Sequence, residues 1–293
     1  MGRSRGNHPT RPALKPLDAT YETRALPPGT ARYWSWLFAA AESRAPLLGI
    51  YALGAEWQAL MDPSTEMSVA HLKLAWWQEE MHRLCRGSAV HPISLYLAAL
   101  PRAAAVDFAP LSVAVTAAAA QVSGAPLERG TDLEPQSRAL WGGPMALASQ
   151  LAGDVGDEAG LRNCTSALAT ADYLSKSIRD YRREARVGRV PFAVDELLAA
   201  GVDNDDLTTD LPPPHLQLYL DGLRKRAAQY FNTAAEMLPP AQRARHRHLL
   251  VLAALGQAHL NSRATPPERR RLKDMFIAWT TARRAHRSIR SPT

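Results

Sequence analysis

Long stretches of helical character alternate with short clusters of proline and glycine along the chain. Extended alternation of apolar and polar residues, which is typical of strands, does not occur. Ala, Leu, Arg, Glu and Gln dominate the long stretches, and these residues favour helices. Breaks fall at clusters such as Gly142-Gly143-Pro144 and Pro212-Pro213-Pro214. The pattern predicts an all-α protein with ten helices, at residues 30–43, 45–61, 66–86, 92–104, 109–121, 134–152, 157–187, 214–237, 240–260 and 267–287.

The composition indicates a single domain. The chain has 293 residues, of which 46% are hydrophobic and 22% charged, and this is a globular composition. A chain of this length can bury a core without a disulfide or a metal ion to support it. We expect one domain over residues 27–287, with a disordered basic tail at 1–26 and a second disordered tail at 288–293.

The charge distribution excludes some classes of protein. The net charge is +7, and residues 261–293 carry nine Lys and Arg against only Glu268 and Asp274. Charge gathered at one end differs from the fold-wide basic surface of a nucleic-acid-binding protein, so no nucleic-acid partner is expected. No run of 18 apolar residues and no apolar leader segment occurs. We therefore expect a cytoplasmic protein.

Three stretches carry the candidate chemistry. The first, YALGAEWQALMD (residues 51–62), ends in a carboxylate. The second, HLKLAWWQEEMHRLCRGSAVHPISLYLAAL (71–100), contains two adjacent tryptophans and a His-Pro pair. The third, DYLSKSIRDYRREARVGRVPFAVDELLAAGV (172–202), combines an Arg-Asp pair with Gly188-Arg189. Taken together, over about residues 30–285, they resemble the squalene/phytoene synthase family.

The resemblance implies an isoprenoid-synthase-like helical bundle around a central apolar cavity. Working members of the family bind prenyl diphosphates, and Mg²⁺ ions bridge the diphosphate to carboxylates on two facing helices. Loss of the diphosphate leaves an allylic cation, and two prenyl chains join head to head. The implied cofactor is therefore Mg²⁺, and the implied partner is a prenyl diphosphate or a related isoprenoid lipid.

The first and third stretches, with one arginine that precedes them, supply candidate site residues by the same resemblance. Asp62, Asp180 and Glu184 match catalytic carboxylates that bind the metal. Asp180 and Glu184 are four residues apart, so they face one side of a helix and can share an ion. Glu56, Glu66 and Asp172 are poorer substitutes. The candidates for contact with the diphosphate are Arg44, Lys176, Arg179, Arg183 and Arg189.

The chain departs from the family pattern in the first Asp-rich cluster and in the third stretch. The cluster reads Gln58-Ala59-Leu60-Met61-Asp62, so only its last carboxylate is kept. The residue one turn before Asp180 is Lys176 instead of the usual Asn, and its cation would compete with a metal ion. Two arrangements remain open: a single Mg²⁺ at Asp180 and Glu184, or a phosphate held by basic side chains without metal.

These departures predict a protein that keeps the fold and binds an isoprenoid, with head-to-head condensation weakened or lost. One alternative is an active prenyl transferase that makes a squalene- or phytoene-type product. A second alternative is a non-catalytic assembly or interaction factor, of the kind that assists complex I assembly.

The segment 267–287 predicts a basic C-terminal helix. Met275, Phe276, Ile277 and Trp279 lie between its arginines. We expect these apolar side chains to face the core and the basic ones to face outwards. Peripheral contact with the inner membrane through this helix would suit a protein that handles apolar lipids.

Overall fold

The computed structural model describes residues 15–153, 156–260 and 267–287. In these residues the fold is all-α, and the one β-type pairing is an isolated bridge between Leu127 and Ala193. The α-helices are α1 Ala19–Ala25, α2 Ala31–Leu37, α3 Ala41–Met61, α4 Met67–Cys85, α5 Pro92–Ala98, α6 Ala109–Val122, α7 Leu133–Ser137, α8 Gly143–Ala152, α9 Glu158–Ala185, α10 Val194–Ala200, α11 Asn204–Thr208, α12 Pro214–Met237, α13 Arg247–Leu260 and α14 Pro267–Arg287. Short 3₁₀ turns at Ala103–Ala105, Gly130–Asp132 and Pro240–Gln242, and a π-helical turn at Arg138–Gly142, connect them.

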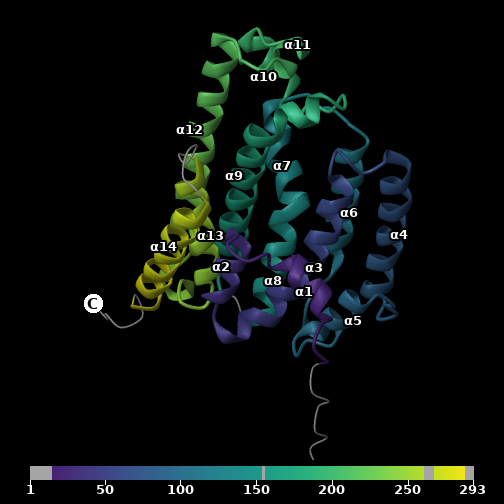
Figure 1. The fold of residues 1–293 in the computed structure, drawn as a ribbon. Helices are drawn as coiled ribbons and strands as arrows, with labels where there is room; N and C mark the ends of the chain where they lie inside the picture. The colour runs from purple at the N-terminus through teal and green to yellow at the C-terminus, as the bar shows by residue number, and fades with distance from the viewer. Residues whose placement is uncertain (1–14, 154–155, 261–266, 288–293) are drawn as a thin grey trace, which may run out of the picture.

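The long helices lie side by side in a bundle (Figure 1). Helix α9 packs against α12, α4 against α6, and α13 against α14, while α8 packs against both α3 and α9. Helix α3 is buried on most of its surface, including Leu47, Ile50, Leu53 and Trp57. A helix that is apolar nearly all round belongs at the centre of a large core. The all-α fold expected from the sequence is thus confirmed.

Proline and glycine explain where helix boundaries differ from the prediction. Segment 134–152 divides into α7, the π-helical turn and α8, because Pro144 has no N–H to donate to the carbonyl of Leu140. Gly142 permits close packing at this turn: a Cβ atom there would lie 3.3 Å from the Cα of Ser166 on α9. Segment 92–104 is helical only to Ala98, shortly before Pro101, and α13 begins at Arg247 instead of residue 240.

The structure extends the ordered domain towards the N-terminus. Residues 19–25, expected in a disordered tail, form α1, which packs against α3. The Asp18 side chain accepts a hydrogen bond from the Thr20 N–H at 2.8 Å, and Ala25 and Leu26 are buried. A capped turn with a buried end is held by tertiary contacts, so the predicted boundary at residue 26 is wrong. The remaining tail predictions, at 1–14 and 288–293, lie outside the described residues.

The orientation of α14 also differs from the prediction. Its buried face consists of Ala278, Ala282, Ala285 and Asp274, and the Asp274 carboxylate pairs with His259 at 2.9 Å. The larger apolar side chains lie on an exposed flank: Leu272, Met275, Phe276 and Trp279. Alanine allows the backbones of α13 and α14 to approach closely, so small residues form this contact. The expectation that Met275, Phe276 and Trp279 face the core is wrong.

The second sequence stretch forms a closely packed corner between α4 and α5. Trp77 is buried and Trp76 is 43% exposed, as expected for neighbours that point about 100° apart on a helix. The His91 ring caps α5 by accepting a hydrogen bond from the Ile93 N–H at 3.2 Å. Its centroid lies 4.6 Å from that of Trp77. Trp77 and His91 are therefore structural residues.

Two histidines on the segment that enters α13 are fully buried. His246 and His248 have ring centroids 6.0 Å apart, and no hydrogen-bond partner is found for their ring nitrogens among the described residues. Burial lowers the pKa of His246 to about 4 and that of His248 to about 3, from an ordinary value of 6.5. Both rings are therefore neutral in the folded protein at pH 7.

We expect replacement of His248 by leucine to stabilise the protein by about 1–2 kcal/mol at pH 7, because an unsatisfied buried polar group costs about that much. The unfolded chain takes up protons below pH 6.5 and the folded chain does not. The stability of the wild type should therefore fall as the pH drops from 6.5 towards 4, and His248→Leu should reduce this fall. Urea unfolding at pH 7 and pH 5 measures both effects. A variant less stable than the wild type at both values would contradict the prediction.

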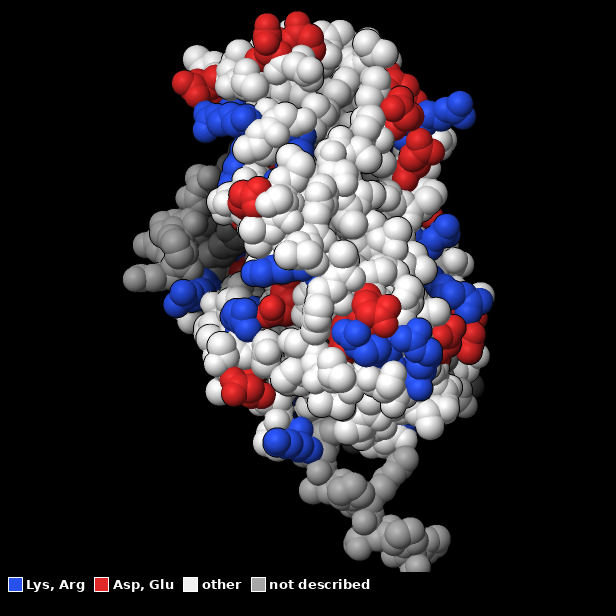
Figure 2. All heavy atoms as spheres, turned by 90° about the vertical axis from the view of Figure 1, so that its right-hand side faces the viewer, with Lys and Arg blue, Asp and Glu red and all other residues white. Residues whose placement is uncertain are grey.

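The surface on the α4 side carries charges of both signs. Figure 2 shows basic and acidic side chains intermingled there, and Glu79 pairs with Arg86 at 3.0 Å. This face has no continuous basic surface, in agreement with the uneven distribution of charge along the sequence. In the described part of the chain, no helix is both long and apolar enough to cross a membrane.

Candidate functional site

The ends of the first and third sequence stretches meet in space. Asp62 follows the last turn of α3, and the third stretch forms the C-terminal half of α9 and the turn after it. Arg183 of α9 makes an ion pair with Asp62. Arg189, beyond α9, donates a hydrogen bond to the Met61 carbonyl at 3.0 Å. Two segments more than a hundred residues apart are thus joined by arginines.

One carboxylate oxygen of Asp62, Oδ1, accepts bonds from three neighbouring donors. Besides its ion pair with Arg183, its Oδ1 atom accepts hydrogen bonds from the Ser64 N–H at 2.9 Å and the Ser64 hydroxyl at 2.5 Å. The bond from Arg183, with smaller contributions from Ser64, holds the pKa of Asp62 far below its usual range. The carboxylate therefore stays ionised at any physiological pH, with its charge balanced by Arg183.

Asp180 forms a two-point contact with its neighbour on α9. The Nε and Nη2 atoms of Arg179 donate to the two carboxylate oxygens of Asp180 at 3.0 and 2.9 Å. This contact raises the pKa of Arg179. The Arg179 side chain is 69% exposed, whereas that of Asp180 is 25% exposed. An arginine in this position covers the oxygens that a metal ion would need.

Glu184 lies one turn further along α9 and is buried. Burial raises its pKa, although the positive charges of Arg189 and Lys176 oppose the shift. The Arg189 Nε atom lies 3.4 Å from Glu184 Oε2, and the Arg189 side chain is only 15% exposed. The two residues form a shielded ion pair in which Arg189 contacts Glu184 and Met61 together.

Lys176 lies among carboxylates on the same face of α9. Burial lowers its pKa, while the charges of Asp172, Glu184 and Asp180 oppose that shift. Lys176 is one helical turn from Asp172 and one from Asp180, so the three residues share one face of α9. Competition between this cation and a metal ion stays a prediction.

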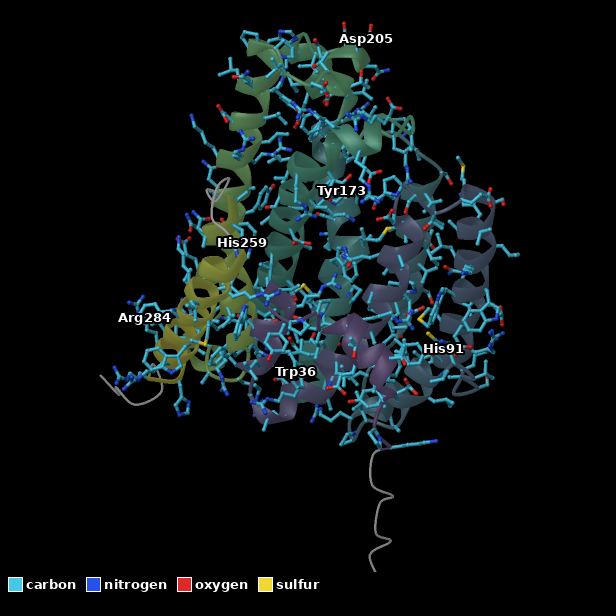
Figure 3. The ribbon with its side chains drawn as sticks, in the orientation of Figure 1. Trp36, His91, Tyr173, Asp205, His259 and Arg284 are labelled. Atoms are coloured by element: carbon cyan, nitrogen blue, oxygen red, sulfur yellow. The ribbon has the colours of Figure 1, made fainter. Side chains whose placement is uncertain are left out.

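A second polar group lies deeper in the bundle and was not identified from the sequence. The Arg32 guanidinium of α2 stands 5.3 Å from the Trp141 ring and 5.8 Å from the Tyr51 ring. Burial lowers the pKa of Arg32, and the charge of Asp172 opposes this. The Tyr51 hydroxyl shares a 2.9 Å hydrogen bond with Ser35. The labelled side chain of Tyr173, next to Asp172, lies centrally in Figure 3.

Two residues of this deeper group lie in the stretches that carry the family resemblance. Tyr51 opens the first stretch, and Asp172 opens the third. Arg32 carried no signal, because it lies outside all three stretches and comes close to Tyr51 only through the packing of α2 beside α3. A pattern within one helix cannot indicate a contact between three helices.

Three nominated residues lie elsewhere. Arg44 is eighteen residues from Asp62 on α3, or about 27 Å along the helix axis. It donates to the Leu37 carbonyl at 2.9 Å, and the structure does not bring it to the cluster. Glu56 pairs with Arg24 at 2.9 Å. Glu66 caps α4 by accepting hydrogen bonds from Ser68 and Val69.

The site fits a magnesium cluster poorly. Among the described residues, no group of three or more His, Cys, Asp or Glu side chains is arranged to hold a metal ion. Asp62, Asp180 and Glu184 each contact a different arginine instead. Mg²⁺ prefers several free oxygens in octahedral geometry. We therefore derive no chemical step through a metal at this site.

The chemistry that the arrangement offers is recognition of an anion. Four basic side chains, Lys176, Arg179, Arg183 and Arg189, gather with four carboxylates, Asp62, Asp172, Asp180 and Glu184. Arginine and lysine bind phosphate oxygens well, and arginine can make two parallel hydrogen bonds. A pocket of about 300 Å³ opens beside the cluster, between the end of α3, the end of α6 and the turn at Gly188-Arg189. Helix α9 does not line this pocket, so the pocket is not the central apolar cavity that the resemblance implies. That cavity stays a prediction.

Comparison with known proteins agrees with the sequence and the fold. The model of a family described as squalene/phytoene synthase matches residues 8–276. A crystal structure of a dehydrosqualene synthase in complex with ligand has a TM-score of 0.70 and 15% identity, covering 91% of this chain and 96% of that one. Squalene synthase HpnC from Alicyclobacillus acidocaldarius has a TM-score of 0.60 and 18% identity, covering 86% and 88%. No curated protein sequence matches. At these identities the structural likeness establishes the fold alone.

Proposed function

Because the chain belongs to the squalene/phytoene synthase family, we propose that it binds a prenyl diphosphate, or a related isoprenoid lipid, where the ends of α3 and α9 meet. The diphosphate contacts Lys176, Arg179, Arg183 and Arg189, and the prenyl chain extends towards Tyr51 and Trp141. Head-to-head condensation is weakened or lost in this proposal.

The observation that carries the proposal is the pairing of each candidate carboxylate with an arginine: Asp62 with Arg183, Asp180 with Arg179, and Glu184 with Arg189. A phosphate group is an acceptor for all three arginines, so it can exchange with the carboxylates without a change of fold. The fixed cations supply charge that Mg²⁺ supplies in working members of the family.

The weakening or loss of condensation follows from the small number of carboxylates that α3 contributes to the site. Condensation needs two diphosphates held together, and α3 contributes one carboxylate, Asp62, instead of a cluster. The protein then acts as an isoprenoid-binding member of the family. Its proposed place of action is the cytoplasmic surface of the inner membrane, where apolar isoprenoids dissolve.

We expect purified protein to release little or no diphosphate from farnesyl or geranylgeranyl diphosphate in the presence of Mg²⁺. A coupled assay for inorganic diphosphate, with extraction of apolar products, measures this. Turnover that is abolished by Asp180→Ala and kept by Asp205→Ala would contradict the proposal and favour an active prenyl transferase. Asp205 is a suitable control because its side chain is exposed on α11, at the tip of the bundle (Figure 3).

Ligand binding distinguishes the proposal from the remaining alternative, a non-catalytic assembly or interaction factor. Farnesyl diphosphate that binds without turnover supports the proposal. Absence of binding to farnesyl diphosphate, geranylgeranyl diphosphate and the corresponding alcohols would overturn it and favour the non-catalytic assembly or interaction factor. Isothermal titration calorimetry measures each affinity directly.

A further inference from the structure

We infer that the exposed flank of α14, together with an adjoining basic pocket, is a docking surface for a membrane containing anionic phospholipids. The inference adds a site to the proposed function. It rests on residues that take no part in the α3–α9 site.

The flank consists of large apolar side chains on one side of a helix. Leu272 is 68% exposed and Phe276 61%, and Met275 and Trp279 are each more than 40% exposed. Their spacing of three and four residues places them on one continuous strip. The Phe276 and Trp279 rings lie 6.1 Å apart, so they form a shared apolar surface. Exposed patches of this kind mark interaction sites.

Basic side chains surround the strip. The Arg283 guanidinium lies 5.2 Å from the Trp279 ring centroid, and Lys273, Arg284 and Arg287 are exposed on the next face of the helix. The single acidic residue in this part of α14, Asp274, is buried against His259. Aromatic and apolar side chains flanked by Arg and Lys are typical of helices that lie in the membrane interface. Arg284 lies at the outer edge of the bundle (Figure 3).

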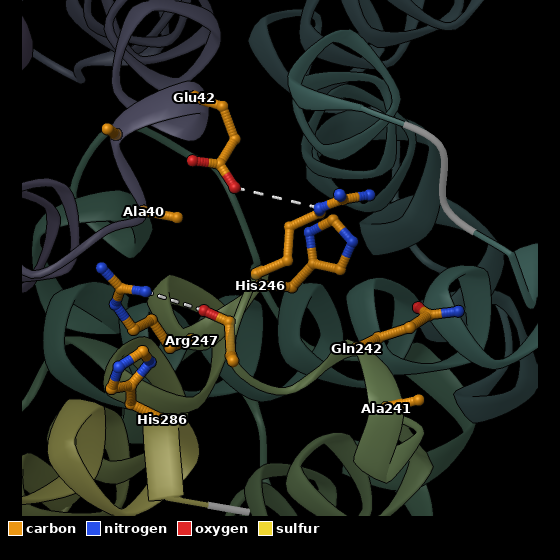
Figure 4. Close-up of a pocket in the computed structure, with 10 residues that line it drawn as sticks. Ala40, Glu42, Ala241, Gln242, His246, Arg247 and His286 are labelled. Atoms are coloured by element: carbon orange, nitrogen blue, oxygen red, sulfur yellow. Dashed lines mark hydrogen bonds and ion pairs between the residues drawn. The ribbon is translucent and has the colours of Figure 1, made fainter. Parts of the chain in front are cut away.

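A pocket of about 470 Å³ adjoins the strip and has a basic lining that includes Arg245, Arg247 and His286 (Figure 4). His286 is seven residues from Trp279 and eleven from Met275, so it lies on the same side of α14 as both. His286 therefore links the pocket to this side of α14. One acidic residue, Glu42, also lines it, with its carboxylate 3.9 Å from the Arg245 Nε atom.

The pocket also receives the N-terminus of α3. Ala40 caps this 21-residue helix without a side-chain hydrogen bond, and Ala40, Ala41 and Glu42 line the pocket. The N-terminus of a long helix attracts anions through its N–H groups and its dipole. Arg247 is fixed beside it by hydrogen bonds to the Phe38 and Ala39 carbonyls at 2.7 and 3.1 Å. A lipid phosphate in the pocket would place its acyl chains along the apolar flank.

The test is sedimentation of the full chain with vesicles, in the absence of any isoprenoid. One set contains phosphatidylcholine alone, and the other contains three parts phosphatidylcholine to one part phosphatidylglycerol. We expect at least tenfold stronger binding to the anionic vesicles, falling as salt is added. The double variant Phe276→Ser/Trp279→Ser should lose at least tenfold of this binding, and His286→Glu should weaken it.

A matched control replaces exposed apolar residues on α12 and before it. Leu218 is 76% exposed and Leu211 86%, so Leu211→Ser/Leu218→Ser should bind vesicles as the wild type does. Equal binding to both vesicle types, or full binding by the Phe276/Trp279 variant, would overturn the inference. A dimer in solution that this variant dissociates would also overturn it and assign the flank to a second copy of the chain. The Phe276/Trp279 variant should bind farnesyl diphosphate as the wild type does. Loss of vesicle binding can then be distinguished from damage to the α3–α9 site.

Discussion

Replacement of Glu80 by alanine is expected to lower the free energy of unfolding by about 3–5 kcal/mol, the usual cost of removing one partner from a buried ion pair. The Glu80 side chain on α4 is completely buried. It accepts hydrogen bonds from the Val90 N–H at 3.0 Å, the His91 N–H at 2.8 Å and the Arg83 Nε at 2.9 Å. The substitution leaves two partly buried backbone donors and a guanidinium without their acceptor.

The effect of pH on this contact has a definite sign. Burial alone would raise the pKa of Glu80, but the hydrogen bonds from His91, Arg83 and Val90 outweigh it and lower the pKa below its ordinary value of 4.5. The contact therefore contributes its full stability above pH 4.5 and loses it as the pH falls through the lowered pKa. Glu80→Ala should remove this part of the acid dependence.

Glu79 provides the control, since it is the preceding residue on the same helix. Its side chain is 53% exposed and its ion pairs lie on the surface, so Glu79→Ala should change stability by less than about 1 kcal/mol. Chemical denaturation measured by circular dichroism compares the two variants. Equal losses of unfolding free energy for Glu79→Ala and Glu80→Ala would contradict the prediction, because the buried contact would then contribute no more than a surface pair.

The second large effect concerns recognition of the diphosphate. The double variant Lys176→Gln/Arg183→Gln should bind farnesyl diphosphate at least about a hundredfold more weakly than the wild type. Each charge-assisted hydrogen bond contributes about 1.5–3 kcal/mol, and every 1.4 kcal/mol corresponds to a factor of ten in affinity. Binding of farnesol, which has no phosphate, should change little.

Calorimetric titrations with EDTA and with Mg²⁺ complete this experiment. If the fixed cations replace the metal, the wild type binds the diphosphate with similar affinity in both conditions. Arg162→Gln is the matched control, because Arg162 lies on the same helix in a surface pair with Glu158, about 30 Å along the axis from Arg183. Binding that requires Mg²⁺, or that survives the double substitution, would contradict the proposed role of Lys176 and Arg183.

Local sequence patterns predicted most of the helices. Segment 214–237 coincides with α12, and 157–187 differs from α9 by one or two residues at each end, because neither contains an internal cluster of proline and glycine. The same reasoning placed Asp180, Glu184 and Lys176 on one face of a helix, since spacing within a helix depends on its geometry alone. It also found that α3 keeps only Asp62.

Tertiary packing decided what these residues contact. The sequence could not show that Arg183 pairs with Asp62 or Arg189 with Met61, because these contacts join residues more than a hundred positions apart. Nor could it identify Arg32 or exclude Arg44, whose places depend on how α2 and α3 pack.

Helix α14 shows most clearly what the local sequence pattern determines and what tertiary packing determines. Its sequence by itself determined that α14 is helical, basic and apolar on one side. Only the packing of Ala278 and Ala282 against Val251 and Leu255 of α13 decided which side is buried. Close approach of two helices favours small residues, so the alanines form the contact and the larger Phe276 and Trp279 remain outside.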